Sequence, residues 1–154
     1  MNREKMRQLL TDRGYPPSED TEWVSPATLK ALGIDTESEL GWFYRTCNPS
    51  FMKSSEPLEE LLDVVEPEVS GVVTPRVGSW ETPVGSTTIY VREGWGVPDD
   101  FICLSTTDTD GAFLYHLPSG QVYEFVRGQY DELRSGVLQP RWKTFFEFIE
   151  WYLA

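Results

Sequence analysis

Few side chains in this sequence could support chemistry. Its only histidine is His116, and its only cysteines are Cys47 and Cys103. A structural zinc site usually takes four cysteine or histidine ligands, so we expect no metal site and no cofactor. One disulfide is arithmetically possible. Because disulfides are rare in reducing compartments, the sequence instead favours two buried, free thiols.

Paired acidic residues can indicate acid–base catalysis, and they occur at two places. Glu59 and Glu60 lie in a predicted helix, where adjacent side chains point in different directions and cannot share a proton. Asp99 and Asp100 precede a predicted strand and are typical of a solvated turn. The chain has no nucleophile elbow, phosphate-binding glycine loop or dinucleotide-binding fingerprint. Neither the paired acids nor any recognised motif indicates a reaction, so we do not expect an enzyme.

The segment Asp108–Gly111 is similar to the start of a calcium-binding loop. An EF-hand would also need an acidic residue at position 106 and a glutamate at position 117, where this chain has Thr106 and Leu117. Two aspartates before a glycine are more typical of a turn, which places their side chains on a loop. We therefore expect Asp108 and Asp110 to contact a partner rather than a metal ion.

The most informative bulk property is charge. The chain has 13 lysines and arginines against 25 aspartates and glutamates, a net charge of −12. A field of this sign repels nucleic acid and anionic membranes and attracts basic partners, although solubility alone is a competing explanation. Tryptophan often carries interface energy, but it can equally lie in the core. The residues expected to contact a basic partner are Asp99, Asp100, Asp108, Asp110, Glu124, Trp80 and Trp95.

The length is that of one ordinary domain, so we treat residues 1–154 as a single unit, with residues 1–22 as an N-terminal helical extension. The first residues are polar and amphipathic, unlike a signal segment, and no run of 18 apolar residues occurs. We therefore expect a cytoplasmic protein. Helices are predicted over the first dozen residues, from Ser25-Pro26 to Gly33, from Asp35 or Thr36 to Cys47, and over Leu58–Val65.

The chain changes character after these helices. Residues Glu68–Val97 are rich in Val, Thr, Gly and Pro and predict a long loop or irregular hairpin. Two similar turns, Thr74–Ser79 and Thr82–Ser86, flank Trp80 within it. The alternation of residue types in Thr88–Arg92 indicates a strand.

The β signal is clearest in the next segment. Phe101–Leu104, Ala112–Leu117 and Gln121–Val126 predict three neighbouring antiparallel strands, and Pro118-Ser119-Gly120 predicts a tight turn between the last two. Trp142–Leu153 then predicts a final helix, with its inward face formed by Phe145, Phe148, Ile149 and Tyr152. This order indicates an α+β fold in which helices pack on one face of a mostly antiparallel sheet.

Three runs in this half of the chain resemble the central hairpins of the SUKH superfamily, particularly its Smi–Knr branch. They are residues 93–105, 108–117 and 119–125, which share the family's Trp–Ile–Pro-like entry, acidic glycine-containing turn and Val-Tyr strand. The ending, residues 145–153, resembles the family's closing Phe-x-x-Phe-Leu helix. The likeness covers residues 93–153 and weakly residues 23–48. The chain departs from the family pattern at Ala112, His116, Thr36-Glu37 and Asn48-Pro49.

This resemblance implies a binding role. Many bacterial members are immunity proteins that neutralise a secreted toxin inside the producing cell, and many of those toxins are nucleases. A nuclease presents a cationic cleft, so the resemblance agrees with the charge of the chain. Fungal members regulate cell-wall synthesis as interaction modules.

Two other functions stay open. One is a regulatory scaffold that has no toxin partner. The other is a small enzyme that acts on a basic or sugar substrate through Asp108, Asp110 and His116. The function that we expect is binding and neutralisation of a basic protein toxin, with no binding to nucleic acid or membrane.

Overall fold

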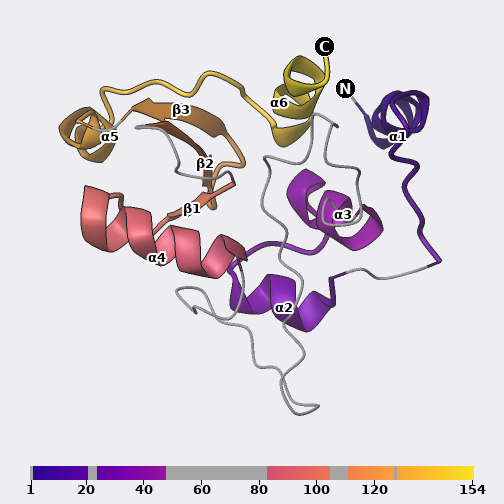
Figure 1. The fold of residues 1–154 in the computed structure, drawn as a ribbon, viewed down its shortest axis with the longest axis horizontal. Coiled ribbons are helices and arrows are strands. Elements are labelled where there is room, and N and C mark those ends of the chain that lie inside the picture. The colour runs from indigo at the N-terminus through magenta and orange to yellow at the C-terminus, as the bar shows by residue number, and fades with distance from the viewer. Residues whose placement is uncertain (1, 21–23, 48–82, 105–110, 127) are drawn as a thin grey trace.

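The computed structural model describes residues 2–20, 24–47, 83–104, 111–126 and 128–154. In this part of the chain, helices surround a three-stranded antiparallel sheet (Figure 1). The α+β class predicted from the sequence is confirmed. The predicted helix Leu58–Val65, the turn Thr74–Ser79 and Trp80 lie outside the described residues.

The sheet is a meander of strands β1 (Phe101–Cys103), β2 (Gly111–His116) and β3 (Val122–Val126). Its order is β1-β2-β3, and both pairings are antiparallel, as predicted. The β2–β3 connection turns tightly at Gly120, whose φ of +74° is a conformation that glycine adopts without steric cost.

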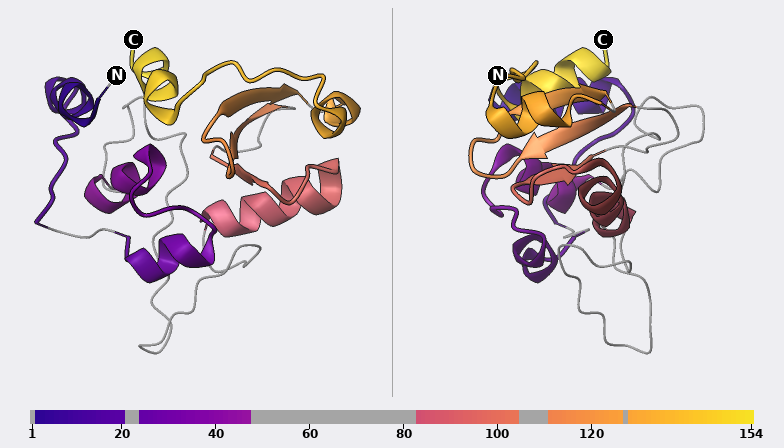
Figure 2. Two further views of the ribbon diagram at one scale, coloured as in Figure 1. Left: turned by 180° about the vertical axis from the view of Figure 1, so that it is seen from behind. Right: turned by 90° about the vertical axis from the view of Figure 1, so that its left-hand side faces the viewer.

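Four helices build the larger of two hydrophobic clusters. They are α1 (Arg3–Asp12), α2 (Pro26–Ala31), α3 (Glu39–Thr46) and α6 (Phe145–Tyr152). Each begins after a polar residue whose side-chain oxygen accepts a backbone N–H three residues later. Figures 1 and 2 show α1, α3 and α6 grouped at one end of the molecule.

The N-terminal helix is part of this cluster. Met6 and Leu10 of α1 are fully buried among the residues of α3 and α6. The predicted N-terminal extension is therefore packed into the same core as the rest of the described chain.

Two further helices, α4 (Pro83–Trp95) and α5 (Tyr130–Ser135), cover the second face of the sheet. There, Val91, Trp95 and Leu133 pack with the strand residues Phe101, Cys103, Leu114 and Phe125. The sheet therefore carries helices on both faces, and the expectation of one covered face was wrong. Alternation in such short strands does not reveal whether the second face meets solvent or helices.

Helix α4 also corrects the local prediction. Thr88–Arg92 was predicted as a strand within a long irregular segment, yet it is helical. Thr88, Val91 and Trp95 are all buried, at the i, i+3, i+7 spacing of a helix face. The β-branched residues matched a strand locally, but packing against β1 overrode that preference.

Two helix starts lie later than predicted. Helix α3 begins at Glu39 because Asp35 forms a turn of its own, in which its carbonyl oxygen accepts a hydrogen bond from Ser38 Oγ at 2.5 Å. Helix α6 begins at Phe145 because the backbone of Trp142 pairs with Val122 of β3.

The two cysteines lie in different clusters. Cys47 belongs to the larger cluster and Cys103 to the smaller one, and both are buried and form no disulfide. In the described part of the chain, no helix combines the length and the apolar character that crossing a membrane requires.

Candidate binding site

The structure separates the residues predicted to contact a partner. Asp108, Asp110 and Trp80 lie outside the described residues. The strand ends that flank the first two in sequence, Cys103 and Gly111, are at the far end of the β1–β2 hairpin from Phe101 and His116. Asp99 and Asp100 lie together in the turn that enters β1.

Trp95 and Glu124 are engaged within the molecule. Trp95 is only 6% exposed and stacks on Phe125, so it belongs to the core. Glu124 on β3 is exposed but forms an ion pair with Arg141. The guanidinium of Arg141 lies over two neighbouring tryptophan rings, 4.7 Å from the centre of Trp142 and 4.5 Å from that of Trp151. Trp95 is therefore too buried to contact a partner, and the charge of Glu124 is already paired.

The Asp99-Asp100 turn is the best-built polar feature among the sequence-predicted residues. Both side chains are exposed. The N–H of Phe101 donates to the carbonyl oxygen of Pro98 at 3.2 Å, and the N–H of Leu117 donates to the carbonyl oxygen of Asp100 at 2.8 Å. The backbone of the turn is therefore tied both to itself and to the end of β2.

Arg92 of α4 braces this turn from one side. Its guanidinium donates to the carbonyl oxygens of Asp99 at 2.6 Å and Phe101 at 2.7 Å. Partial burial lowers the pKa of Arg92, while the nearby Asp99 and Asp100 act in the opposite direction. Sequence reasoning missed Arg92, because its contact with the turn depends on a helix that was predicted as a strand.

His116 holds the turn from the other side. Its Nε2 lies 2.8 Å from Oδ2 of Asp100, and its Nδ1 lies 2.7 Å from Oγ of Ser119. The ring also packs against Phe101, with centroids 4.8 Å apart. Register explains the contact, because Phe101 and His116 are paired residues on the same face of the sheet. Sequence reasoning weighed His116 as a metal ligand and as a catalytic residue and placed Ser119 in the β2–β3 turn, but it did not predict their hydrogen bond.

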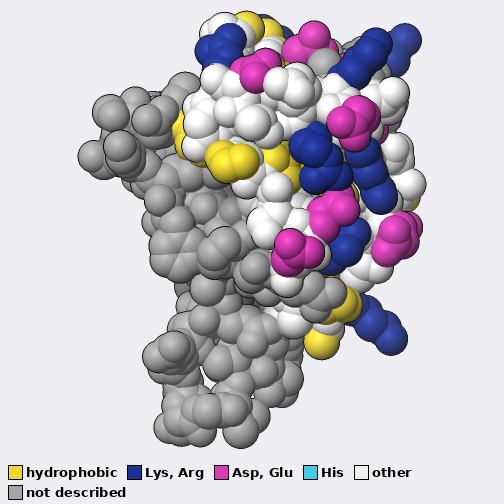
Figure 3. Space-filling model, turned by 90° about the vertical axis from the view of Figure 1, so that its right-hand side faces the viewer, with side chains coloured by type: hydrophobic (Ala, Val, Ile, Leu, Met, Phe, Trp, Pro, Cys, Tyr) yellow, Lys and Arg dark blue, Asp and Glu magenta, His cyan; other side chains and the backbone are white. Residues whose placement is uncertain are grey.

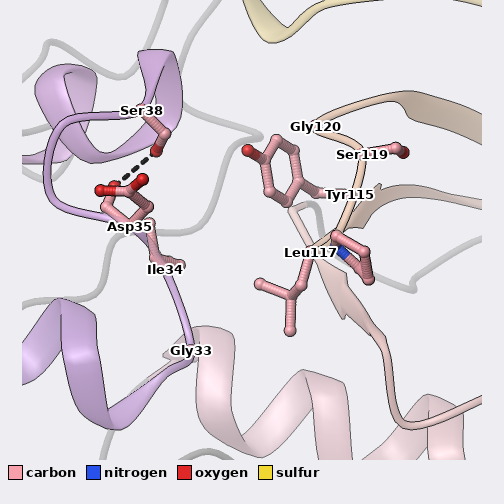
Figure 4. A pocket seen from close by; sticks show the side chains of 9 residues that line it. Gly33, Ile34, Asp35, Ser38, Tyr115, Leu117, Ser119 and Gly120 are labelled. Carbon is pink, nitrogen blue, oxygen red and sulfur yellow. Dashed lines mark hydrogen bonds between the residues drawn. The ribbon is translucent and has the colours of Figure 1, made fainter.

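The order carboxylate, imidazole, hydroxyl is also that of serine hydrolases, in which histidine activates the serine. Here the hydroxyl has a local role, since Ser119 Oγ also accepts the backbone N–H of Gln121 at 3.3 Å. A cavity lies beside the β2–β3 turn, with Ser38 on its opposite wall (Figure 4). The Ser119 side chain points away from this cavity and from Ser38. The arrangement orients Asp100 and stabilises the β2–β3 turn.

A cavity of about 200 Å³ lies beside this turn. It separates the α2–α3 connection from the end of β2 and the β2–β3 turn (Figure 4). Burial raises the pKa of Tyr115; Ser38 lowers it through a hydrogen bond, and the charges of Glu39 and Asp35 raise it. The cavity is lined by Gly33, Ile34, Asp35, Ser38, Tyr115, Leu117, Pro118, Ser119 and Gly120.

The end of the molecule that holds α1 and α3 carries both basic and acidic side chains. Figure 3 views this side, where basic and acidic side chains alternate over α1 and α3. Glu37 lies 3.9 Å from both Arg3 and Arg45, and Arg7 pairs with Glu4 at 3.8 Å and with Glu19. Most of these charges are therefore compensated locally.

Metal binding has no support in the described ranges, where no three histidine, cysteine or acidic side chains are grouped to hold an ion. Comparison with known proteins adds no assignment, because no family model and no curated protein matches this chain.

Proposed function

We propose that this chain is an immunity-type binding protein that neutralises a basic protein toxin in the cytoplasm through the Asp99-Asp100 turn. The observation that carries the proposal is the state of these two carboxylates. Both are exposed on a braced turn, and within the described residues neither forms an ion pair with a lysine or arginine. The net charge of −12 and the resemblance to the SUKH superfamily support the same function.

The physical advantage of such a turn lies in its rigidity. Arg92 and His116 fix the backbone and one carboxylate before any partner arrives. Binding then requires little further ordering of the turn, and that saving increases affinity. The negative field of the whole chain accelerates encounter with a cationic surface, and added salt weakens this steering. A nuclease is the toxin class that this charge favours most.

Asp99→Lys/Asp100→Lys tests the proposal on the partner recovered from the native host. We expect association to slow by about tenfold or more and to lose much of its salt dependence. The matched control is Asp131→Lys/Glu132→Lys, which makes the same change in charge on exposed positions of α5. An unchanged affinity in the first variant, with its fold intact, would contradict the proposed contact.

A second comparison uses Asp108→Lys/Asp110→Lys. These residues stay a prediction for the partner surface, and their neighbours Cys103 and Gly111 lie at the far end of the hairpin. If the partner covers the Asp99-Asp100 turn, this variant should reduce affinity less than Asp99→Lys/Asp100→Lys does. The reverse order would contradict the Asp99-Asp100 turn as the main contact.

A further inference from the structure

The cavity lies beside the β2–β3 turn, which is hydrogen-bonded to the proposed contact. Ser119 lines the cavity and is hydrogen-bonded to His116, which in turn holds Asp100. The cavity opens to solvent, because Asp35 and Pro118 at its edge are exposed. A partner that covers both sides of the β2–β3 turn would reach the acidic turn and this opening together.

The lining has an apolar part and a polar part. Leu117, Pro118 and Ile34 supply aliphatic surface. The Tyr115 ring extends from β2 with its hydroxyl foremost, toward Ser38 and Asp35 on the opposite wall (Figure 4). A ligand that fits both parts needs an aliphatic stem and a polar end.

The charge of the polar part of the lining determines whether the polar end of the ligand should be a cation or an anion. Asp35 lines the cavity, and no lysine or arginine is among the described residues that line it. The Tyr115 hydroxyl is neutral at physiological pH, because its pKa is raised above the ordinary value of 10.0, and its oxygen can accept a hydrogen bond. The Ser38 hydroxyl is already engaged, because it accepts the N–H of Gly41 and donates to the carbonyl oxygen of Asp35. The carboxylate of Asp35 and the hydroxyl oxygen of Tyr115 therefore suit a donor-rich cation and disfavour an anion.

The size of the cavity restricts the ligand further. Its volume of about 200 Å³ is below the roughly 300–1,000 Å³ of pockets that hold drug-sized molecules or cofactors. A single long side chain is a better match for this space. We propose that the cavity accepts one lysine or arginine side chain of the basic partner, with its stem against Leu117 and Pro118 and its cationic end at Asp35 and Tyr115. This inference rests on the proposed function and names the group that the partner inserts.

The test uses small probes on the isolated chain, so it does not depend on the partner. Nα-acetyl-lysine N-methylamide and its arginine analogue are titrated while NMR shifts of Gly33, Tyr115 and Gly120 are followed. The neutral isostere Nα-acetyl-norleucine N-methylamide is the control ligand. We expect at least one cationic probe to bind about tenfold more tightly than norleucine, the factor for one charge-assisted hydrogen bond.

Two variants locate the binding. Asp35→Asn should remove most of the preference for the cationic probe, because it keeps the side-chain oxygen that accepts the N–H of Glu37 but loses the charge. Glu37→Gln removes one charge from the same connection, outside the cavity lining, and should leave probe binding unchanged.

Each outcome decides the inference. Equal binding of lysine and norleucine probes, no binding at all, or equal effects of the two variants would overturn it. These results would leave the role of the Asp99-Asp100 turn to the partner experiment. If the probes bind as expected but Asp99→Lys/Asp100→Lys leaves the partner's affinity unchanged, the cavity does bind cationic side chains. In that case the proposed function fails instead.

Discussion

The α1–α3 face and the Asp99-Asp100 turn are both rich in acidic residues, but the two regions differ in whether arginines form ion pairs with those residues. On the α1–α3 face, Glu19 and Glu37 lie beside arginines and form ion pairs. At the turn, the nearby Arg92 donates to backbone carbonyl oxygens, and no lysine or arginine in the described part of the chain forms an ion pair with Asp99 or Asp100. Net charge alone does not distinguish these cases. An acidic residue is more available to a basic partner where no lysine or arginine forms an ion pair with its carboxylate.

The first region is mainly structural. Exposed ion pairs contribute little each, typically less than about 1 kcal/mol. Beneath them, however, Trp42 is buried, packs edge-on against Phe146 of α6 and donates its indole N–H to Glu19 at 3.2 Å. Arg7 of α1 lies 5.7 Å from the centre of the same ring. The charges of this face therefore surround a residue that joins α1, α3 and α6.

The largest expected effect is a loss of stability in the α1–α3 face. Trp42→Ala should reduce the free energy of unfolding by about 3–5 kcal/mol, because it leaves a cavity at the junction of three helices. Chemical denaturation measures the change. Trp151→Ala is the matched control: Trp151 is 42% exposed, so its loss should be clearly smaller. Equal losses would mean that the α1–α3 face is no more structural than the C-terminal surface.

A smaller effect is expected where the turn is braced. Arg92→Met keeps most of the aliphatic stem but removes the hydrogen bonds to Asp99 and Phe101, and should cost about 1.5–3 kcal/mol. Amide hydrogen exchange should also accelerate at Phe101. Arg134→Met on α5 changes an exposed arginine and is the control. If both variants are equally stable, Arg92 does not hold the turn.

The smallest effect depends on pH. Hydrogen bonds from Arg7 and then from Trp42 hold the pKa of Glu19 below its ordinary value of 4.5. The stability that the ionised form contributes is therefore present above pH 4.5 and is lost as the pH falls through the lowered pKa. Glu19→Gln should weaken this acid dependence in unfolding experiments between about pH 3 and 6. Asp20→Asn, at the neighbouring exposed position, should not.

The parts of the fold with local signals were predictable from sequence. Ser25-Pro26 marked the start of α2 because capping depends on residues within one turn. The three strands and their antiparallel order followed from alternation and from the turn at Gly120. The turn at Asp99-Asp100 was also predicted, because paired aspartates before a strand suit a solvated bend.

The parts that depend on distant contacts were not predictable. Helix α4 has strand-like residues, and its helical form is supported by contacts such as Cys103 N–H to Thr88 Oγ1 at 3.1 Å. The link from Asp100 to His116 spans 16 positions and exists only because β1 and β2 pair in one register. The pairing of Glu124 with Arg141 has the same origin, and composition could not reveal that this acid is compensated.

The two cysteines lie in different hydrophobic clusters, so the labelling rate of each thiol measures the opening of its own cluster. Burial raises the pKa of the Cys47 thiol to about 12, so at neutral pH it reacts with an alkylating reagent only after its surroundings open. Cys103 is fully buried in the cluster beneath α4. With one thiol in each cluster, the two labelling rates separate a local fluctuation near α3 from one near α4. Cooperative opening of the whole domain would instead expose both sulfur atoms at a single rate.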